Sequence, residues 1–301
     1  MALLGVPAGR ALAGDVFVDC AAVLDGDGSQ AHPFRRLSDL RPPGGAPLAE
    51  GTNILFRRGA ICHGQFLTSG SGTPAAPIRV LAYGPGVKRP VIAGDGVSGE
   101  GAEGAAFVLL NQEYWEVRDI VVTNHGHAPA ERNGVLVMLQ DFPRAVAHHV
   151  VLDNIVVRDV NGADVQSKRS NGIQFRVTGS VAPNSFDDIV VRNSVIAHVD
   201  REGLTTTSDQ KCRPQIGCAA RPDWRPFTHV VFERNDIHDI GGDGLVIRVS
   251  RDAVVRGNVG TDLAMRSAYS NAGFWTINSD GTLFEGNRVE RTRRRPGNHV
   301  G

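Results

Sequence analysis

The sequence predicts an all-β protein, a single right-handed parallel β-helix whose coils stack along one axis. Three observations predict this fold. The chain of 301 residues contains 36 Gly and 16 Pro but only three Met, a composition typical of short strands separated by turns. A strand phrase that begins with glycine recurs along the chain, and a second phrase that ends in Asn recurs beside it.

Glycine opens five strand phrases that align with one another. They are Gly134-Val-Leu-Val-Met, Gly172-Ile-Gln-Phe-Arg, Gly203-Leu-Thr-Thr-Thr, Gly244-Leu-Val-Ile-Arg and Gly273-Phe-Trp-Thr-Ile, with Gly104-Ala-Ala-Phe-Val as a looser earlier member. The intervals between the five glycines are 38, 31, 41 and 29 residues. Because the phrase is constant while the interval varies, we expect loops of different length between strands that stack in register.

The second phrase places an Asn after a short apolar strand in successive coils. Its members end at Asn154, Asn193, Asn235, Asn258 and Asn287, with Asp119 in an earlier one. Asn adopts a left-handed backbone more readily than most residues, and stacked amides can hydrogen-bond from strand to strand. We therefore expect a ladder of bends along the solenoid.

A β-propeller is the rival fold. Propeller blades are antiparallel hairpins, and their two-residue turns favour Asn-Gly or Asp-Gly. Such pairs do not recur at regular places between matched strands of this chain, so the sequence favours the β-helix.

One domain is expected, with three parts. Residues 1–13 end in the triplet Ala11-Leu-Ala13, so we expect a remnant of a secretory signal there. Residues 14–103 are predicted to form the N-terminal cap and the first irregular coils, with 33–40 as an amphipathic cover. Residues 104–301 are predicted to form regular coils. Gly301 falls where another groove strand would begin, so we expect a solenoid truncated in mid-coil.

Charge and cysteine content narrow the class of protein. The 32 basic and 32 acidic residues balance, so no net field attracts nucleic acid, and no apolar run is long enough to cross a membrane. We expect a secreted monomer. Four cysteines allow three pairings, of which we favour Cys20–Cys62 with Cys212–Cys218. A zinc site is disfavoured because there is no C-x-x-C pair.

Several phrases spread over nearly the whole chain carry a family resemblance. They are Asp25-Gly-Asp-Gly-Ser, Gly70-Ser-Gly-Thr, Ala82-Tyr-Gly-Pro-Gly, Tyr114-Trp-Glu-Val-Arg-Asp119, Val199-Asp-Arg-Glu-Gly203, Gly241-Gly-Asp-Gly244 and Asn271-Ala-Gly-Phe-Trp275. With these phrases the chain resembles the secreted right-handed parallel β-helix proteins of the pectate-lyase-like superfamily. The resemblance implies a carbohydrate-active protein, and the superfamily includes lyases, hydrolases, epimerases and non-catalytic adhesins.

The groove strands predict where a polysaccharide would bind. Side chains alternate along a strand, so the residue after each glycine should point inward and the next one outward. The outward positions Gln174, Arg176, Arg248 and Trp275 then line a groove. Lys168 lies on a polar loop that we expect to overhang it. We assign Lys168, Gln174, Arg176 and Trp275 to substrate binding.

Glu202 and Asp243 occupy equivalent places, just before the glycines of consecutive coils. Their carboxylates should lie about one or two strand spacings apart, where like charges need a shared proton, a cation or an Arg. Arg201, Arg248 and Asp200 are near enough in the pattern to provide such partners. Structural ion pairing is the alternative to catalysis for this pair.

The favoured reaction is β-elimination of a polymer that contains uronic acid. Ca²⁺ held by Asp200, Glu202 and Asp243, or an Arg, would neutralise the substrate carboxylate and acidify the neighbouring proton. Arg176, Arg201 or Arg248 would then bind the carboxylate or act as the base.

Two other functions remain open. In a glycoside hydrolase, Glu202 and Asp243 would be the acid and the base, and their separation would decide retention or inversion. Trp275 would stack on a sugar in either enzyme. A non-catalytic glycan-binding solenoid would have the same fold and an equally polar groove.

Overall fold

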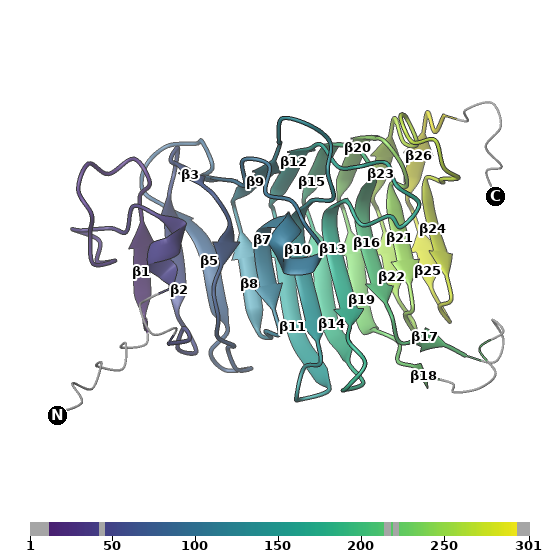
Figure 1. Cartoon of the computed structure of the whole chain (residues 1–301), viewed down its shortest axis with the longest axis horizontal. Helices are drawn as coiled ribbons and strands as arrows, with labels where there is room; N and C mark the ends of the chain where they lie inside the picture. Colours follow the sequence, from purple (N-terminus) through teal and green to yellow (C-terminus); the bar gives the residue numbers. More distant parts are fainter. Residues whose placement is uncertain (1–11, 42–45, 214–217, 219–222, 294–301) are drawn as a thin grey trace, which may run out of the picture.

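The chain folds into a parallel β-helix whose coils stack along the long axis, from β1 at one end to β24–β26 at the other (Figure 1). The computed structural model describes residues 12–41, 46–213, 218 and 223–293. The predicted fold is confirmed. Most of the expected leader, 1–11, and Gly301 of the expected next coil lie outside the described residues.

Three parallel sheets form the walls of the solenoid. In spatial order, the nine-stranded sheet contains β1 (Asp15–Val18), β2 (Asn53–Arg57), β5 (Ile78–Tyr83), β8 (Trp115–Arg118), β11 (Val146–Asp153), β14 (Ser185–Arg192), β19 (Thr228–Glu233), β22 (Val254–Arg256) and β25 (Leu283–Glu285). The seven-stranded sheet contains β24 (Phe274–Ile277), β21 (Leu245–Arg248), β16 (Glu202–Ser208), β13 (Asn171–Thr178), β10 (Asn133–Gln140), β7 (Ala105–Leu110) and β4 (Phe66–Leu67).

The eight-stranded sheet contains β26 (Arg288–Glu290), β23 (Val259–Thr261), β20 (Asp236–Ile240), β15 (Val195–Val199), β12 (Val156–Val160), β9 (Val121–Asn124), β6 (Val91–Ala93) and β3 (Ile61–His63). Outside these sheets lie an antiparallel pair, β17 (Lys211–Cys212) with β18 (Asp223–Trp224), and two 3₁₀ turns, η1 (Leu37–Leu40) and η2 (Gly101–Gly104). Leu37 and Leu40 of η1 are buried in the main core.

The glycine-led phrases all fall in the seven-stranded sheet and stack in the expected register. Val135 pairs with Ile173, Ile173 with Leu204, Leu204 with Leu245, and Leu245 with Phe274. The earlier phrase is displaced, because Asn133 pairs with Ala105, so that Ala106 and not Gly104 lies opposite Gly134.

Close approach explains the recurring glycine. A Cβ at Gly172 would lie 2.7 Å from the carbonyl oxygen of Gly203 and 2.7 Å from Cγ2 of Ile196. Any side chain there would push the seven-stranded sheet away from the eight-stranded one. The glycine therefore fixes the corner at which each coil turns into its groove strand.

The Asn phrases form two ladders where one was expected. Asp119, Asn154 and Asn193 have left-handed backbones, with φ of 58°, 55° and 52°. From the next coil on, the left-handed residue is the one before the Asn, as at Arg234 with φ 52°. The later amides therefore turn inward and stack: Asn235 Nδ2 donates to Asn258 Oδ1 at 3.0 Å, and the chain of amides continues to Asn287.

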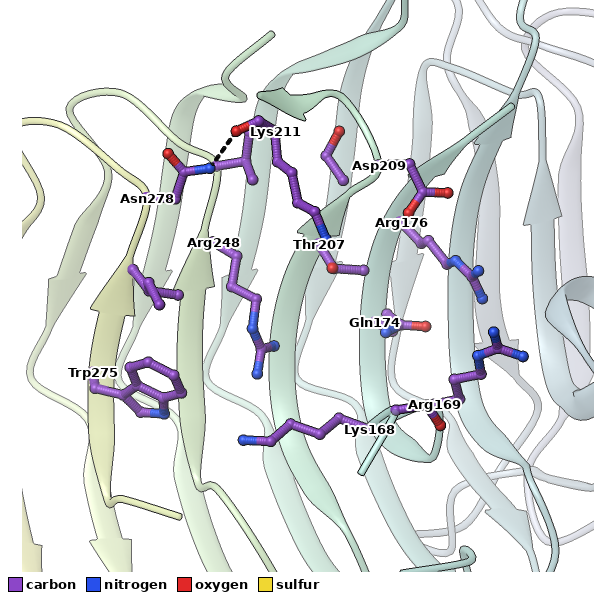
Figure 2. A pocket seen from close by; sticks show the side chains of 14 residues that line it. Lys168, Arg169, Gln174, Arg176, Thr207, Asp209, Lys211, Arg248, Trp275 and Asn278 are labelled. Carbon is purple, nitrogen blue, oxygen red and sulfur yellow. Dashed lines mark hydrogen bonds between the residues drawn. The ribbon is translucent and has the colours of Figure 1, made fainter. Parts of the chain in front are cut away.

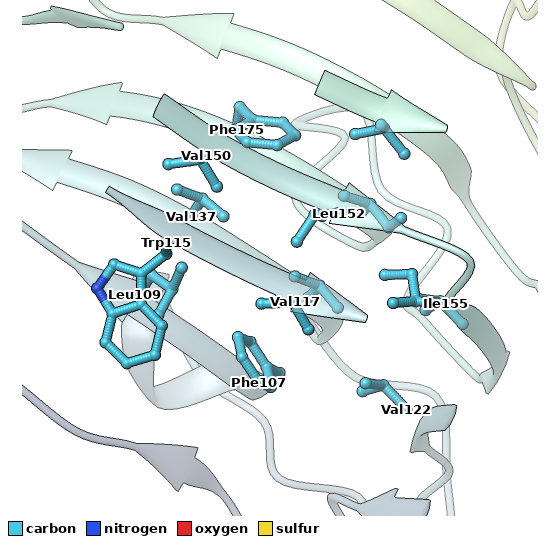
Figure 3. Packing of buried hydrophobic residues seen from close by; sticks show 14 of the residues in the cluster. Phe107, Leu109, Trp115, Val117, Val122, Val137, Val150, Leu152, Ile155 and Phe175 are labelled. Carbon is cyan, nitrogen blue, oxygen red and sulfur yellow. The ribbon is translucent and has the colours of Figure 1, made fainter. Parts of the chain in front are cut away.

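The core is a continuous stack of aliphatic and aromatic side chains between the three sheets (Figure 3). Phe66 and Phe107 stack with their ring centroids 4.3 Å apart, and Phe175 packs edge-on against Phe186. This core places the outer face of the seven-stranded sheet on a rigid base, since interiors of this kind resist deformation.

Both expected disulfides are present, Cys20–Cys62 and Cys212–Cys218. The second joins two cysteines six residues apart, and its Cys212 lies in β17. Among the described residues, no helix is long and apolar enough to cross a membrane.

Candidate active site

A groove of about 550 Å³ lies on the outer face of the seven-stranded sheet, across β13, β16, β21 and β24 (Figure 2). Gln174, Arg176, Arg248 and Trp275 line it, as the alternation of side chains predicted. Lys168 overhangs it from the 161–170 loop between β12 and β13. The groove therefore contains all four residues that the sequence assigned to substrate binding, together with Arg248.

The groove opens only over the later coils because an apolar cluster covers the earlier ones. Outward-facing Val108 and Leu136 are fully buried, and Met138 is nearly so. Ala102 of η2, Leu67 and Leu110 pack against them. The outer face of β7 and β10 is thus covered in its middle, and a smaller pocket of about 280 Å³ beside η2, lined by Glu100, Glu103 and Gln140, is separate from the groove.

The two expected carboxylates lie side by side beneath Lys168 and Arg248, two of the residues that line the groove. Asn171 pairs with Glu202 in adjacent strands, and Asp243 precedes the next strand at the same level. Both side chains are completely buried. Arg248 covers them, as its place in the pattern predicted, and so does Lys168, which the sequence had assigned to substrate binding.

Two cations hold this carboxylate pair. Arg248 binds Glu202 with both ends of its guanidinium, at 2.7 and 3.1 Å. Lys168 Nζ lies 2.5 Å from Asp243 Oδ2 and 3.6 Å from Glu202 Oε1. The backbone N–H of Ala272 donates to the other oxygen of Asp243 at 2.6 Å. Planar two-point binding of this kind fixes the direction of a carboxylate as well as its charge.

The pKa values of the two carboxyls shift in opposite directions. Burial raises the pKa of Glu202, and the charges of Arg248 and Lys168 only partly offset it. Burial also acts to raise the pKa of Asp243, but the charge of Lys168 and hydrogen bonds from Glu202, Lys168 and Ala272 outweigh it and lower the pKa overall. Glu202 is therefore the member of the pair that retains a proton most readily, and Asp243 is the ionised one.

Trp275 forms part of the floor beside this pair. Lys168 Nζ lies 5.4 Å and the Arg248 guanidinium 5.6 Å from the centre of its ring. Its indole Nε1 and the Oε1 of Gln174 are buried and have no hydrogen-bond partner among the described residues. One donor and one acceptor beside the groove are thus buried without a partner, which is uncommon in folded proteins.

Arg201 and Asp200 do not join the groove, which corrects the expectation from sequence. Arg201 is completely buried and donates to the carbonyl of Val165 and to Asn271. Asp200 accepts from Arg266 at 3.0 Å. Both residues lie in the turn before β16, where strand alternation does not fix the direction of a side chain.

The expected calcium ligands do not assemble. Asp200 is paired elsewhere, and in the described part of the chain no three His, Cys, Asp or Glu side chains are grouped so as to hold a metal ion. Glu202 and Asp243 are instead bound by protein cations. These residues do not fit a carboxylate-bound Ca²⁺, which prefers six to eight oxygen ligands.

A second pocket of about 500 Å³ adjoins the first across Lys168 and Trp275. Asp243 forms part of its wall, and Tyr269 and Asn271 enter from the 262–273 loop between β23 and β24. Sequence reasoning missed this pocket because both of its loops lie outside the strand repeat. The phrase Asn271-Ala-Gly-Phe-Trp275 was the feature that could have indicated it.

Comparisons with known proteins found a distant sequence relative and solved structures of similar fold. No protein-family model matches the chain. A lacto-N-biosidase of Bifidobacterium longum subsp. longum is 22% identical over 302 aligned positions, which cover 78% of this chain and 19% of that protein. The chain thus spans about a fifth of this curated relative.

A solved enzyme has a similar fold. The GH136 lacto-N-biosidase from Eubacterium ramulus superposes with a TM-score of 0.73 in its selenomethionine form and 0.72 in its native form, at 20% identity. The match covers 91% of this chain and 55% of the enzyme. This likeness shows that the two share the β-helix architecture.

Proposed function

We propose that this chain is the β-helical part of a glycoside hydrolase in which Glu202 and Asp243 are the paired catalytic carboxyls. The observation that carries the proposal is their side-by-side placement in consecutive coils with pKa values moved in opposite directions. Hydrolysis of a glycosidic bond needs one carboxyl that gives a proton and one that is ionised. The lacto-N-biosidases of similar sequence and fold support this class of reaction.

Each carboxyl takes the role that its environment favours. Glu202 would protonate the leaving oxygen, and Asp243, which borders the second pocket, would attack the anomeric carbon or activate water. Lys168 lies between the two carboxylates, so a bound sugar would displace its ammonium group toward Trp275. Glycan binding and opening of this ion pair would then occur together.

The geometry favours retention of the anomeric configuration. A single nitrogen, Lys168 Nζ, lies 2.5 and 3.6 Å from one oxygen of each carboxylate, so these oxygens are at most about 6 Å apart. This upper limit is shorter than the roughly 6.5–9.5 Å between the carboxyl groups of inverting glycosidases, and it is compatible with the roughly 5–5.5 Å of retaining ones. Asp243 is then the nucleophile.

Hydrolysis replaces β-elimination as the better-supported reading. Arg201, one of the expected bases, is buried away from the groove, and Arg248 is engaged by Glu202. The similar proteins named above are hydrolases. We keep the secreted location as part of the proposal, because two disulfides suit an oxidising compartment.

The test is an activity screen of the full chain against oligosaccharides that end in a lacto-N-biose unit and against uronate polymers. We expect new reducing ends and no product that absorbs in the ultraviolet. Glu202→Gln and Asp243→Asn should each lower kcat by about 10²–10⁴-fold. Glu233→Gln is the matched control, since Glu233 is also nearly buried between two arginines but lies on the nine-stranded sheet.

Three results would contradict the proposal. Unsaturated products would indicate a lyase, and glycan binding without cleavage would indicate a binding module. Full activity of both Glu202→Gln and Asp243→Asn would show that other groups carry the chemistry. Proton NMR of the first product formed would report the anomeric configuration.

A further inference from the structure

The second pocket is enclosed by two loops from coils that are far apart in the sequence. The 161–170 loop contributes Gln166 and Lys168, and the 262–273 loop contributes Tyr269, Ser270 and Asn271. Between these loops lie the coils of β15–β16 and β20–β21. Something must hold the two loops together, because loops of this length do not fix their own distance.

Asp164 and Arg201 form the connection. One oxygen of Asp164 accepts from the hydroxyl of Ser267 and the other from the backbone N–H of Ala268, each at 2.6 Å. Arg201 Nε lies 3.3 Å from Asp164 and 3.3 Å from the carbonyl of Val165 on the same loop. Its Nη1 donates to Asn271 on the opposite loop. Arg201 thus binds both of the loops that form the walls of the second pocket.

The backbone is shaped to admit this side chain. A Cβ at Gly242 would lie 2.1 Å from Nη1 of Arg201 and 2.5 Å from the carbonyl oxygen of Arg201. Any larger residue at 242 would displace the guanidinium. The Gly241-Gly-Asp-Gly244 phrase therefore serves the pocket as well as the corner of its coil.

The lining of the second pocket is uncharged except for one pair. Lys168 and Asp243 are bound to each other at 2.5 Å, so they neutralise each other. The remaining lining consists of two amides, the hydroxyl of Ser270, the methyl group of Ala272 and two aromatic residues, Tyr269 and Trp275. Aromatic rings with nearby amides bind the apolar face and the hydroxyls of a pyranose. The first groove differs, since five basic residues line it: Lys168, Arg169, Arg176, Lys211 and Arg248.

We propose that the second pocket is a subsite for an uncharged sugar unit, and that Arg201 and Asp164 are positioning residues that assemble its two walls. This inference rests on the proposed glycoside hydrolase, whose substrate class it specifies. The second pocket has a volume of about 500 Å³, which lies within the range of roughly 300–1,000 Å³ that small-molecule sites have. The sugar next to the scissile bond on this side is therefore neutral.

The test measures binding and hydrolysis separately. Titration calorimetry with lacto-N-biose as the neutral probe and digalacturonate as the acidic probe gives Kd for the full chain. Tyr269→Ala removes one ring from a partly exposed position and Asp164→Ala breaks the connection between the loops. We expect each to raise the Kd for lacto-N-biose about tenfold, which corresponds to about 1.4 kcal/mol. Arg201→Lys should restore part of the affinity that Arg201→Met loses.

Asp153→Ala is the matched control, because Asp153 also binds groups of a neighbouring coil, Arg192 and Asn193, but lies on the nine-stranded sheet. Its Kd should stay within twofold of the wild type. A merely structural role of Asp164 would lower thermal stability in both Asp164→Ala and Asp153→Ala while leaving the Kd unchanged. Urea unfolding of every variant, together with its circular dichroism spectrum, identifies any that fails to fold.

The outcomes separate this inference from the proposed function. Neutral-sugar binding that depends on Tyr269 and Asp164 supports the subsite even if the wild type hydrolyses nothing, in which case only the proposed function fails. If folded Tyr269→Ala and Asp164→Ala hydrolyse the substrate with an unchanged KM and bind lacto-N-biose with an unchanged Kd, the subsite is wrong and the proposed function stands. If digalacturonate binds as tightly as lacto-N-biose and competes with it, the specificity for an uncharged sugar is wrong.

Discussion

Replacing Arg248 by Met removes the guanidinium that binds the fully buried Glu202 through two hydrogen bonds. Breaking a buried ion pair from one side costs about 3–5 kcal/mol, because the remaining charge keeps its desolvation penalty. Lys168 stays 3.6 Å from Glu202 and retains part of the attraction. We therefore expect the free energy of unfolding to fall by about 3 kcal/mol at neutral pH, the lower end of this range.

The loss should depend on pH with a defined sign. Burial already raises the pKa of Glu202 in the folded state, so its contribution to stability is fully present below the unfolded pKa and is lost as pH rises through the folded pKa. Without Arg248 the folded pKa rises further. The deficit of Arg248→Met relative to the wild type should therefore be smallest near pH 5 and largest near pH 8.

Urea unfolding followed by both tryptophan fluorescence and far-ultraviolet circular dichroism measures this effect, since a solenoid need not unfold in one step. Glu202→Gln in the Arg248→Met background should recover most of the loss. Arg256→Met is the control, because Arg256 also binds a nearly buried carboxylate, Glu233, but is half exposed and should cost no more than about 1 kcal/mol. Equal losses in Arg248→Met and Arg256→Met, or a loss that does not vary with pH, would refute the reasoning.

Three further variants test the solenoid itself. Asn258→Ala leaves amide and backbone partners on both neighbouring coils unsatisfied. Thermal unfolding should therefore show that the free energy of unfolding falls by at least about 2 kcal/mol. An unchanged free energy would mean that the amide ladder does not contribute to stability. Cys20→Ser combined with Cys62→Ser opens a link across 42 residues and should cost about 2–4 kcal/mol in denaturant melts, a prediction that an unchanged midpoint would contradict. Phe175→Ala empties a fully buried site in the aromatic stack and should cost about 3–5 kcal/mol by the same assay, and a cost under 1 kcal/mol would mean that the coils repack around it.

The strand register could be predicted from the sequence because it depends on local rules. Alternation along a strand and a glycine at each corner fix which residues face the core, and Ile173 and Leu204 stack as expected. The same rules placed Gln174 and Trp275 in the groove. The pairing of Glu202 with Asp243 followed from their equal position in two coils.

The turn before β16 could not be predicted in this way. Arg201 lies one residue from Glu202, yet the two side chains serve different surfaces, because the backbone bends at the corner and alternation is interrupted there. The Asn ladder shows the same limit. A shift of one residue between Asn193 and Asn235 moved the left-handed bend to Arg234 and turned the later amides inward.

Lys168 depends on a loop whose path no periodic pattern specifies. Its position over Asp243 brings together residues 75 apart in the chain. Asp164, on the same loop, reaches residues more than 100 positions away. Contacts of this kind depend on loop length and on what the opposite loop offers, so only a three-dimensional structure reveals them.

The walls of the second pocket belong to connections between strands, while the two carboxyls lie at the edge of the stacked sheet. Loop length can change in a solenoid without disturbing the packing of neighbouring coils. Exchanging residues 162–167 and 265–271 together, as a matched pair, is therefore a route to altered sugar preference. Lys168 and Ala272, which bind the two carboxyls, and the buried Leu263 would be kept. Most of the wall of the second pocket can therefore vary in length and sequence while the strands that carry the two carboxyls stay the same.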